Sequence, residues 1–473
     1  MPHDPTTPAA DRAADRAADR AADRAADRAV LTRPPMGWNS WDGYGTTVTE
    51  DEVLANARFL AGHDGGAMAR AGWDTVVVDI QWYEPTARPG GYNAAAPVLF
   101  DERGFLQPVV ARFPSAAGGQ GFAPLAAAVH DLGLRFGIHL MRGIARRVVE
   151  ADLPVLGTPY RTGEIADATS TCPWNSDCYG LRVDHPGAQA WLDAMIDHVV
   201  GWGVDFLKVD DMLAPYHAGA VEALSLAVRR AELNHGRRVV VSLSPGTDLS
   251  LAHLEHLREH ADMWRVSDDL WDRWPDVEAQ LGRMARWAPH SGPAGWADAD
   301  MLPLGRIGLR AERGAPRDSL LTVDERRTML SLWCLARSPL FVGGDLPTSD
   351  AATVADLVHP GVLEVAHRSS GGRELLREGP AGGETVVWGA ATGDGADATR
   401  WVGLFSTADE PSRVRVLAAA AGLPGRPGAV VDVWSGERVA LGAPGPGTGG
   451  DSVLDVDIPA HGVRLLRLDR STA

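Results

Sequence analysis

Cysteine is scarce in this chain, whose 473 residues include only Cys172, Cys178 and Cys334. Three cysteines exclude a disulfide framework and leave no pair of spaced thiolates for zinc. Cys172 and Cys178 stand close enough in sequence to be bridged across a short loop. The sequence nevertheless favours a reduced pair, because the protein is expected to be cytoplasmic.

Long apolar runs and an excess of basic residues are also absent. No apolar run approaches the length of a membrane span, and the N-terminus lacks the apolar core of a secretory signal. The formal net charge of −17 argues against a nucleic acid or an anionic membrane as partner, because both attract basic surfaces. We therefore expect a cytoplasmic protein that acts on a small neutral molecule. The sequence leaves open whether copies of the chain form a homo-oligomer.

The composition divides the chain into three stretches. Residues 9–28 repeat Ala-Ala-Asp-Arg five times without an apolar face, so residues 1–33 are interpreted as a solvated arm that is disordered or partly helical. Residues 34–360 form the predicted catalytic domain. Residues 361–473 hold short strands separated by Gly, Pro and Asp turns, which predicts an antiparallel β-sandwich with a packing role.

The middle stretch alternates buried apolar strands with amphipathic helices. This alternation is typical of a parallel sheet, and its repetition predicts closure into a (β/α)8 barrel, or TIM barrel. The predicted strands include Thr75 to Asp79, Phe136 to His139, Asp205 to Asp210, Val239 to Ser242, Met263 to Asp269 and Pro339 to Gly344. The predicted helices include Glu50 to Leu60, Pro124 to Leu132, Ala188 to Trp202, Ala218 to Glu232 and Leu251 to His260.

Polar or aromatic residues stand where these strands end. They are Trp41, Asp79, His139, Lys208 with Asp210, Ser242 with Ser244, and Arg265 with Asp269. In a parallel barrel the active site lies at the carboxyl ends of the strands. One such residue is weak evidence, but so many strand ends converging on one rim indicate a functional site.

Lys208 and Asp210 are the first candidate pair. Side chains two apart on a strand share a face, so both residues would point the same way. A neighbouring cation keeps an Asp ionised, which is the state that a carboxylate nucleophile needs. Alone, such a pair is more often an ordinary ion pair that closes a strand.

Asp269 is the second candidate carboxylate. If a strand runs through residues 264–269, Arg265 and Asp269 face the barrel mouth while Asp268 faces away. Nearby tryptophans and an opposing carboxylate would raise the pKa of Asp269 so that it holds a proton. Glycoside hydrolysis needs two such unlike carboxylates, about 5 to 5.5 Å apart in a retaining enzyme. Asp300 is a further rim acid, suited to binding a hydroxyl or to capping a turn or helix.

These motifs resemble those of the melibiase, or α-galactosidase, family of retaining glycosidases, glycoside hydrolase family 27. The resembling segments are Met36 to Trp41, Leu207 to Asp210, Trp264 and Arg265 with Asp269, Gly292 to Leu302, and Ser338 to Phe341. The resemblance implies Asp210 as nucleophile and Asp269 as acid/base, without a metal or organic cofactor. It also implies a set of sugar contacts, namely Trp41, Asp79, Lys208, Arg265 and Asp300.

The sugar pocket departs from the family pattern. Members usually carry two adjacent aspartates that grip the 4-hydroxyl and 6-hydroxyl of galactose, whereas this chain has Asp79 and Ile80. A hydroxyl placed against Ile80 would be left unpaired, at a cost of about 1 to 3 kcal/mol. His139 also stands where the family has a tyrosine, and Met212 where it often has a cysteine. The resemblance thus implies an α-galactosidase with an altered pocket, with a β-L-arabinopyranosidase or an isomalto-dextranase-like enzyme as alternatives.

Two other classes remain open from the residues alone. A metal-dependent sugar isomerase also places Asp and His at barrel strand ends. A catalytically inactive carbohydrate-binding barrel would retain sugar contacts without turnover.

Overall fold

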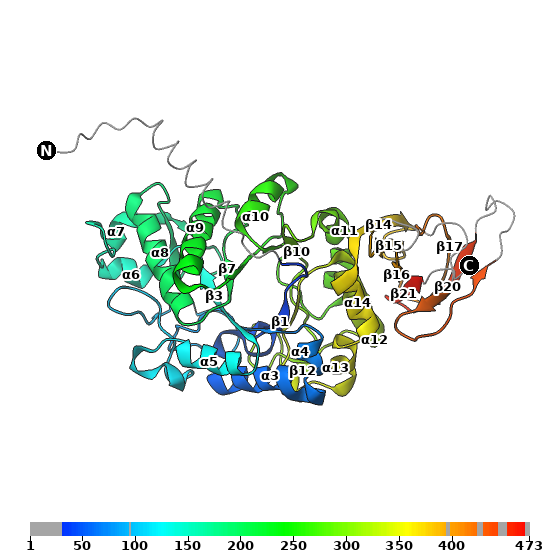
Figure 1. The fold of residues 1–473 in the computed structure, drawn as a ribbon, viewed down its shortest axis with the longest axis horizontal. Helices are drawn as coiled ribbons and strands as arrows, with labels where there is room; N and C mark the ends of the chain where they lie inside the picture. The colour runs from blue at the N-terminus through cyan, green and yellow to red at the C-terminus, as the bar shows by residue number, and fades with distance from the viewer. Residues whose placement is uncertain (1–30, 94–95, 394–397, 423–428, 443–451, 469–473) are drawn as a thin grey trace.

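The computed structural model describes residues 31–93, 96–393, 398–422, 429–442 and 452–468. Residues 1–30 of the predicted arm, residues 1–33, lie outside the described residues. The prediction that the arm is disordered or partly helical therefore also falls outside them. Figure 1 shows a large barrel region beside a smaller region that contains the last strands of the chain.

Eight parallel strands form the barrel. They are β1 (Met36–Asn39), β2 (Thr75–Val78), β3 (Arg135–Met141), β7 (Phe206–Asp210), β8 (Val240–Leu243), β9 (Met263–Arg265), β10 (Trp296–Asp298) and β13 (Leu340–Val342). Their order in the sheet is β10-β9-β8-β7-β3-β2-β1-β13. A parallel bridge between Leu302 and Val342 joins the two ends of this order. The predicted (β/α)8 class is confirmed.

Helices surround the strands. The longer ones are α3 (Glu50–Gly62), α5 (Ala123–Asp131), α8 (Pro186–Gly201), α9 (Ala218–His235), α10 (Leu254–His260), α11 (Trp274–Trp287) and α12 (Val323–Ala336). The shorter ones are α2 (Trp41–Tyr44), α4 (Ala67–Arg70), α6 (Arg146–Ala151), α7 (Thr162–Ile165), α13 (Ala351–Leu357) and α14 (Pro360–Arg368). Short 3₁₀ turns are η1 (Gly45–Thr47), η2 (His63–Gly65), η3 (Pro114–Gly119), η4 (Leu251–His253), η5 (Ala288–His290) and η6 (Leu346–Thr348).

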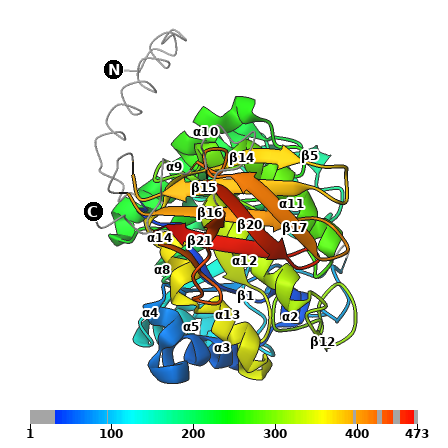
Figure 2. The ribbon, with the colours of Figure 1, turned by 90° about the vertical axis from the view of Figure 1, so that its right-hand side faces the viewer.

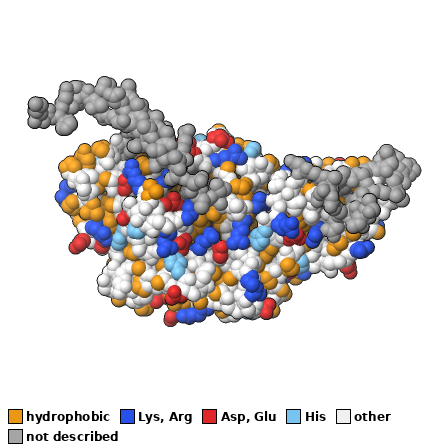
Figure 3. Space-filling view, viewed as in Figure 1, with side chains coloured by type: hydrophobic (Ala, Val, Ile, Leu, Met, Phe, Trp, Pro, Cys, Tyr) orange, Lys and Arg blue, Asp and Glu red, His pale blue; other side chains and the backbone are white. Residues whose placement is uncertain are grey.

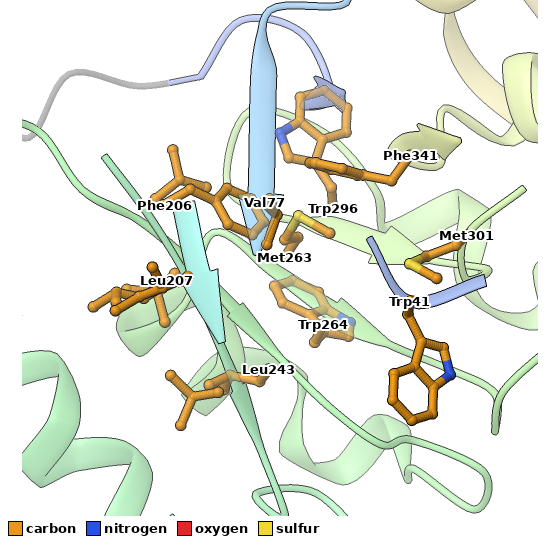
Figure 4. Close-up of a cluster of buried hydrophobic side chains, with 14 of the residues drawn as sticks. Trp41, Val77, Phe206, Leu207, Leu243, Met263, Trp264, Trp296, Met301 and Phe341 are labelled. Carbon is orange, nitrogen blue, oxygen red and sulfur yellow. The ribbon is translucent and has the colours of Figure 1, made fainter. Parts of the chain in front are cut away.

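Large side chains fill the inside of the barrel. Figure 4 shows Phe206, Met263, Trp264, Trp296 and Phe341 gathered between the strands, and all five are buried. Close packing of this kind leaves little room at the neighbouring backbone. A Cβ on Gly37 would lie 2.2 Å from the carbonyl oxygen of Thr75, so β1 and β2 can approach closely only with glycine there.

Two parts of the barrel region differ from the prediction. The strand expected from Met263 to Asp269 ends at Arg265, and residues 266–269 form a bend. An unpredicted antiparallel sheet follows β3, built from β4 (Ile144–Ala145), β5 (Ala166–Thr171) and β6 (Cys178–Leu181). A second small ladder pairs β11 (Arg306–Ile307) with β12 (Arg317–Asp318). Cys172, which directly follows β5, and Cys178, the first residue of β6, are free thiols.

The C-terminal region consists of two antiparallel sheets, seen face-on in Figure 2. One sheet has the order β14-β15-β16-β21-β18 and the other β17-β20-β19. Their strands are β14 (Ser370–Glu378), β15 (Thr385–Ala391), β16 (Arg400–Ser406), β17 (Ser412–Leu417), β18 (Val430–Asp432), β19 (Leu441–Gly442), β20 (Val453–Ile458) and β21 (Val463–Leu468). The predicted β-sandwich is therefore present. The boundary at residue 360 stays a prediction.

The surface is electrostatically mixed. In Figure 3 basic and acidic side chains are interspersed over the described surface that faces the viewer. Within the described ranges, no helix has both the length and the apolar content to cross a bilayer. No group of three or more His, Cys, Asp or Glu side chains in the described ranges is placed to hold a metal ion.

Candidate active site

The carboxyl ends of the barrel strands bring the predicted site residues together. Asp210 is the last residue of β7, and Lys208 lies two positions before it in the same strand. Asp79 directly follows β2, while Trp41 opens α2 just after β1. The others are His139 within β3, Arg265 at the end of β9, Asp269 in the loop after β9, and Asp300 two residues after β10.

Asp210 is held by groups from its own and the neighbouring strand. The Nε2 atom of His139 lies 3.3 Å from its Oδ2, and the backbone N–H of Asp211 donates to its Oδ1 over 3.0 Å. Burial alone would raise the pKa of Asp210, but the His139 hydrogen bond and the charges of His139 and Lys208 outweigh burial and lower this pKa. Asp210 is therefore ionised at neutral pH, as a nucleophile must be.

Lys208 does not form the direct ion pair with Asp210 that the sequence suggested. Its Nζ instead donates to Oδ2 of Asp79 over 2.8 Å, and Nδ2 of Asn39 donates to the same oxygen over 2.7 Å. The strand register explains this choice, because β3 lies between β7 and β2 and the long lysine side chain reaches across it. Burial would raise the pKa of Asp79, but Lys208 and His139 lower it well below the usual range.

Ile80 directly follows Asp79 in the chain. Its side chain is 2% exposed, and its backbone N–H donates to Oδ1 of Asp79 over 2.8 Å. Asp79 therefore has hydrogen bonds at both carboxylate oxygens. The Ile80 side chain, in contrast, has no polar atom that could bind a sugar hydroxyl.

Arg265 connects the second carboxylate to Asp300. Its Nη2 donates to Oδ1 of Asp269 over 3.0 Å, and its Nη1 lies 2.8 Å from Oδ1 of Asp300. The Asp269 side chain is 33% exposed and the Asp300 side chain only 3%. Asp269 is thus the more accessible of the two carboxylates that Arg265 contacts. It lies in a loop, whereas the sequence predicted it on a strand that continues past Arg265.

Asp300 is more firmly tied to the protein than the expected role as a sugar contact suggested. Its Oδ2 accepts a hydrogen bond from the backbone N–H of Leu270 over 2.7 Å, so it fixes the loop beside Asp269. Its φ of +85° is unusual for a residue other than glycine. Burial raises the pKa of Asp300 to about 7, against the opposing charge of Arg265.

The two candidate carboxylates share one electrostatic environment. The charges of Asp210 and Asp269 both raise the pKa of Lys208 and that of Arg265. Several buried polar atoms at the same strand ends have no hydrogen-bond partner within the described part of the chain, namely Trp41 Nε1, Asp42 Oδ2, His139 Nδ1, Arg265 Nε and Ser267 Oγ. Such atoms suit a ligand rich in hydroxyl groups, because each buried polar group needs a partner.

Two residues near the carboxylates were missed by sequence reasoning. Asp42 is buried in α2, and the charges of Asp300 and Asp269 reach it. Tyr92, in the loop after β2, stacks on Trp41 with ring centroids 5.1 Å apart. The position of Asp42, directly after Trp41, was the one signal that could have identified it. Tyr92 lies in a Gly-rich loop that has no periodic pattern.

Comparison with known proteins agrees with this geometry. A family profile described as alpha galactosidase A matches residues 174–365, and one described as the alpha galactosidase C-terminal beta sandwich domain matches residues 382–468. Alpha-galactosidase A of Cellvibrio japonicus is 24% identical over 461 residues, which is 92% of this chain and 91% of that protein. Alpha-galactosidase 3 of Arabidopsis thaliana is 26% identical over 385 residues, covering 80% and 70%.

A solved structure shows a stronger likeness. The β-L-arabinopyranosidase of Geobacillus stearothermophilus, in complex with arabinose, is 40% identical with a TM-score of 0.85, covering 93% of this chain and 98% of that one. Fold and site thus define a TIM-barrel glycoside hydrolase. The chain belongs to the melibiase, or α-galactosidase, family, glycoside hydrolase family 27. This membership argues for a hydrolase over the sugar isomerase.

Proposed function

We propose that this chain is a retaining exo-acting β-L-arabinopyranosidase. The observation that carries the proposal is Ile80, a buried apolar residue directly after Asp79, which is the expected sugar contact. L-arabinopyranose has the ring arrangement of galactose without the hydroxymethyl group, so it leaves no 6-hydroxyl unpaired against Ile80. The 40% identity to the Geobacillus β-L-arabinopyranosidase supports the same choice.

The proposed chemistry is a double displacement. Asp210, ionised beside His139, attacks the anomeric carbon of the terminal sugar while Asp269 donates a proton to the leaving oxygen. Asp269 then removes a proton from the water that releases the sugar from Asp210. Lys208 and Asp79, which are hydrogen-bonded to each other, would bind sugar hydroxyls. Arg265 orients Asp269.

An α-galactosidase is the second candidate, since the curated relatives with that name match over most of the chain.

A panel of p-nitrophenyl glycosides separates these candidates. We expect the β-L-arabinopyranoside to have a higher kcat/KM than the α-D-galactoside, and NMR to show the β-anomer of arabinose as the first product. The Ile80→Asp variant should move the ratio of the two kcat/KM values toward galactoside by about 5- to 150-fold, the value of one buried hydrogen bond. Ile80→Val serves as the apolar control and should keep the parent ratio.

Other outcomes of this panel would contradict the proposal. Faster cleavage of the galactoside by the parent enzyme identifies an α-galactosidase. Formation of the α-anomer of arabinose first rules out retention. Absence of turnover on every glycoside, with sugar binding intact, identifies a carbohydrate-binding barrel.

A further inference from the structure

A row of aromatic rings leads outward from the sugar pocket. Trp41 is buried beside the pocket, whereas Tyr92 and Trp174 are half-buried. The Tyr92 ring stacks on Trp41 at 5.1 Å, and Trp174 packs against Tyr92 at 5.0 Å with its plane tilted by 46°. Trp41 opens α2 after β1, Tyr92 lies in the loop after β2, and Trp174 lies between β5 and β6 in the segment that follows β3. The three rings therefore line one side of the barrel mouth.

Hydrogen bonds hold the two outer loops in place. The side-chain amide of Gln81 donates to Oδ2 of Asp177 over 2.7 Å, and its carbonyl oxygen accepts from the backbone N–H of Asn93 over 3.2 Å. Asn93 follows Tyr92, and Asp177 lies three residues after Trp174. Gln81 therefore joins the loop that carries Tyr92 to the loop that carries Trp174. A rigid, preformed surface of this kind binds with little loss of entropy.

Glu312 approaches the same place from another loop. Its Cγ lies 3.3 Å from where a Cβ on Gly91 would be, so the Glu312 side chain packs against the backbone next to Tyr92. Burial, followed by the charge of Asp269, raises the pKa of Glu312. Burial, followed by the charges of Asp269 and Asp210, also raises the pKa of Tyr92. Both polar groups therefore lie within electrostatic reach of Asp269, which would protonate the leaving oxygen.

The Tyr92 hydroxyl makes no hydrogen bond among the described residues, although its ring is fixed on two sides by Trp41 and Trp174. Glu312 likewise forms no hydrogen bond to a described residue. The Tyr92 hydroxyl and the Glu312 carboxylate are thus two polar groups without a hydrogen-bond partner in the described ranges, on loops next to the partly buried Trp174 indole.

We propose that Tyr92, Trp174 and Glu312 form the subsite that holds the leaving group, and that this group is a neutral second sugar. Its ring stacks on Trp174, and its hydroxyls bond to Glu312 and Tyr92. An acidic sugar is disfavoured, because Glu312 and Asp268 together place more negative charge there than the neighbouring cation, Arg313, offsets. The inference rests on the proposed glycosidase activity, and it names the substrate as an oligosaccharide and not a simple alkyl glycoside.

The test compares two substrates that share the same terminal sugar. One is the β-L-arabinopyranosyl fluoride, whose leaving group is too small to fill the subsite, and the other is a disaccharide with a neutral hexose as leaving group. We expect Trp174→Ala to lower the ratio of kcat/KM for the disaccharide to that for the fluoride by about tenfold, the value of one aromatic contact. Trp174→Phe should recover most of this ratio.

Charge selectivity provides the second measurement. The parent enzyme should cleave the neutral disaccharide faster than one with a uronic acid as leaving group, and Glu312→Gln should narrow this difference several-fold. Glu410→Gln is the matched control, since Glu410 is exposed and lies in the C-terminal region; it should leave both ratios unchanged. Because each measurement is a ratio within one variant, partial loss of folded enzyme does not alter it.

The outcomes separate this inference from the proposed function. If the parent cleaves the galactosyl fluoride and not the arabinosyl fluoride, the substrate proposal fails, and the same ratios are measured with the galactosyl pair. If neither fluoride is cleaved, both proposals fail. If the fluoride is cleaved but Trp174→Ala and Glu312→Gln leave the ratios unchanged, the leaving-group subsite alone is overturned.

Discussion

One basic residue of the site is unique in the chain. The 45 lysines and arginines of the protein include a single lysine, Lys208. Lysine is a compact point charge, whereas the planar guanidinium of arginine needs a wider space and a forked set of acceptors. The short contact of Lys208 with Asp79, in a space shared with His139, suits the smaller cation.

This uniqueness makes the charge state of Lys208 directly measurable. Burial alone would lower its pKa, but the charges of Asp79 and Asp210 outweigh burial and raise it well above the usual value. Reductive methylation at pH 8 requires the neutral amine, so we expect Lys208 in the folded protein to react at least about tenfold more slowly than in urea, one pKa unit being a factor of ten. Peptide mass mapping distinguishes it from the α-amino group. Equal rates in the two states would contradict a raised pKa.

Ionisation of the buried Asp42 carboxyl should lower the free energy of unfolding of the protein as the pH rises. Its carboxyl is buried, and no described residue forms a hydrogen bond with Oδ2. Burial, and then the charges of Asp300 and Asp269, raise the pKa of Asp42 well above its usual value. The folded state therefore binds this proton more tightly than the unfolded state, so the free energy of unfolding falls as the pH rises from about 4 toward the folded pKa.

Asp42→Asn removes this titration while keeping the shape of the side chain. We expect the free energy of unfolding of the variant, relative to the parent, to increase steadily between pH 5 and pH 9. Urea denaturation at a series of pH values measures the difference. Asp51→Asn is the control, since Asp51 is exposed at the start of α3 and should give a nearly constant difference. A constant difference for Asp42→Asn as well would refute the account.

At the scale of elements, the sequence predicts best where a strand is buried on both faces. The mainly apolar runs of β2, β7 and β8 place these strands within a residue or two of their observed bounds. The sheet of β4 to β6 was missed, because β5 is a polar run of Ala, Asp, Thr and Ser without alternation. Its short strands are held by pairing with one another, which no local pattern reveals.

In the candidate site, too, residues that share one strand could be predicted, whereas contacts between separate elements could not. Lys208 and Asp210 could be predicted because they share one strand, and Asp269 was selected by the parity of a strand that in fact ends at Arg265. Asp269 still reaches Arg265 because the loop turns back over four residues. The contact of His139 with Asp210, and the stacking of Tyr92 on Trp41, join separate elements. Neither contact leaves a signal at one point of the sequence.

At the scale of the molecule, the hydrophobic core of the barrel continues into one face of the C-terminal region. A second cluster of buried side chains, which includes Val402, Leu404 and Leu454, lies between the C-terminal sheets. Helix α12 lies between the barrel and the C-terminal region, and residues from Met329 to Ala336 are buried without interruption. Trp388, Phe405 and Leu465 of the C-terminal strands belong to the same core cluster as this helix. Polar contacts cross the junction too, since Trp434 Nε1 donates to Oγ of Ser331 over 2.9 Å.

A shared core predicts that the two regions unfold together. A helix buried on all sides cannot keep its apolar surface from water if either neighbour unfolds. Loss of glycosidase activity, which reports on the barrel, should therefore coincide with the change in far-UV circular dichroism in a urea titration. Activity lost at lower urea, with a separate later transition for the remaining structure, would show that the regions are independent.

Two leucine variants test whether the shared core causes the barrel and the C-terminal region to unfold together. Leu465→Asp would bury a charge in the shared core, where the side chain is 0% exposed. The substitution should destabilise the barrel as well. We expect it to lower the urea midpoint for loss of activity as much as the urea midpoint for the change in circular dichroism. Leu417→Asp changes a side chain of the same region that is 39% exposed, and should leave both midpoints nearly unchanged. If Leu465→Asp moved only the circular dichroism midpoint, the C-terminal region would be a separate unit, and the packing role predicted for it would be wrong.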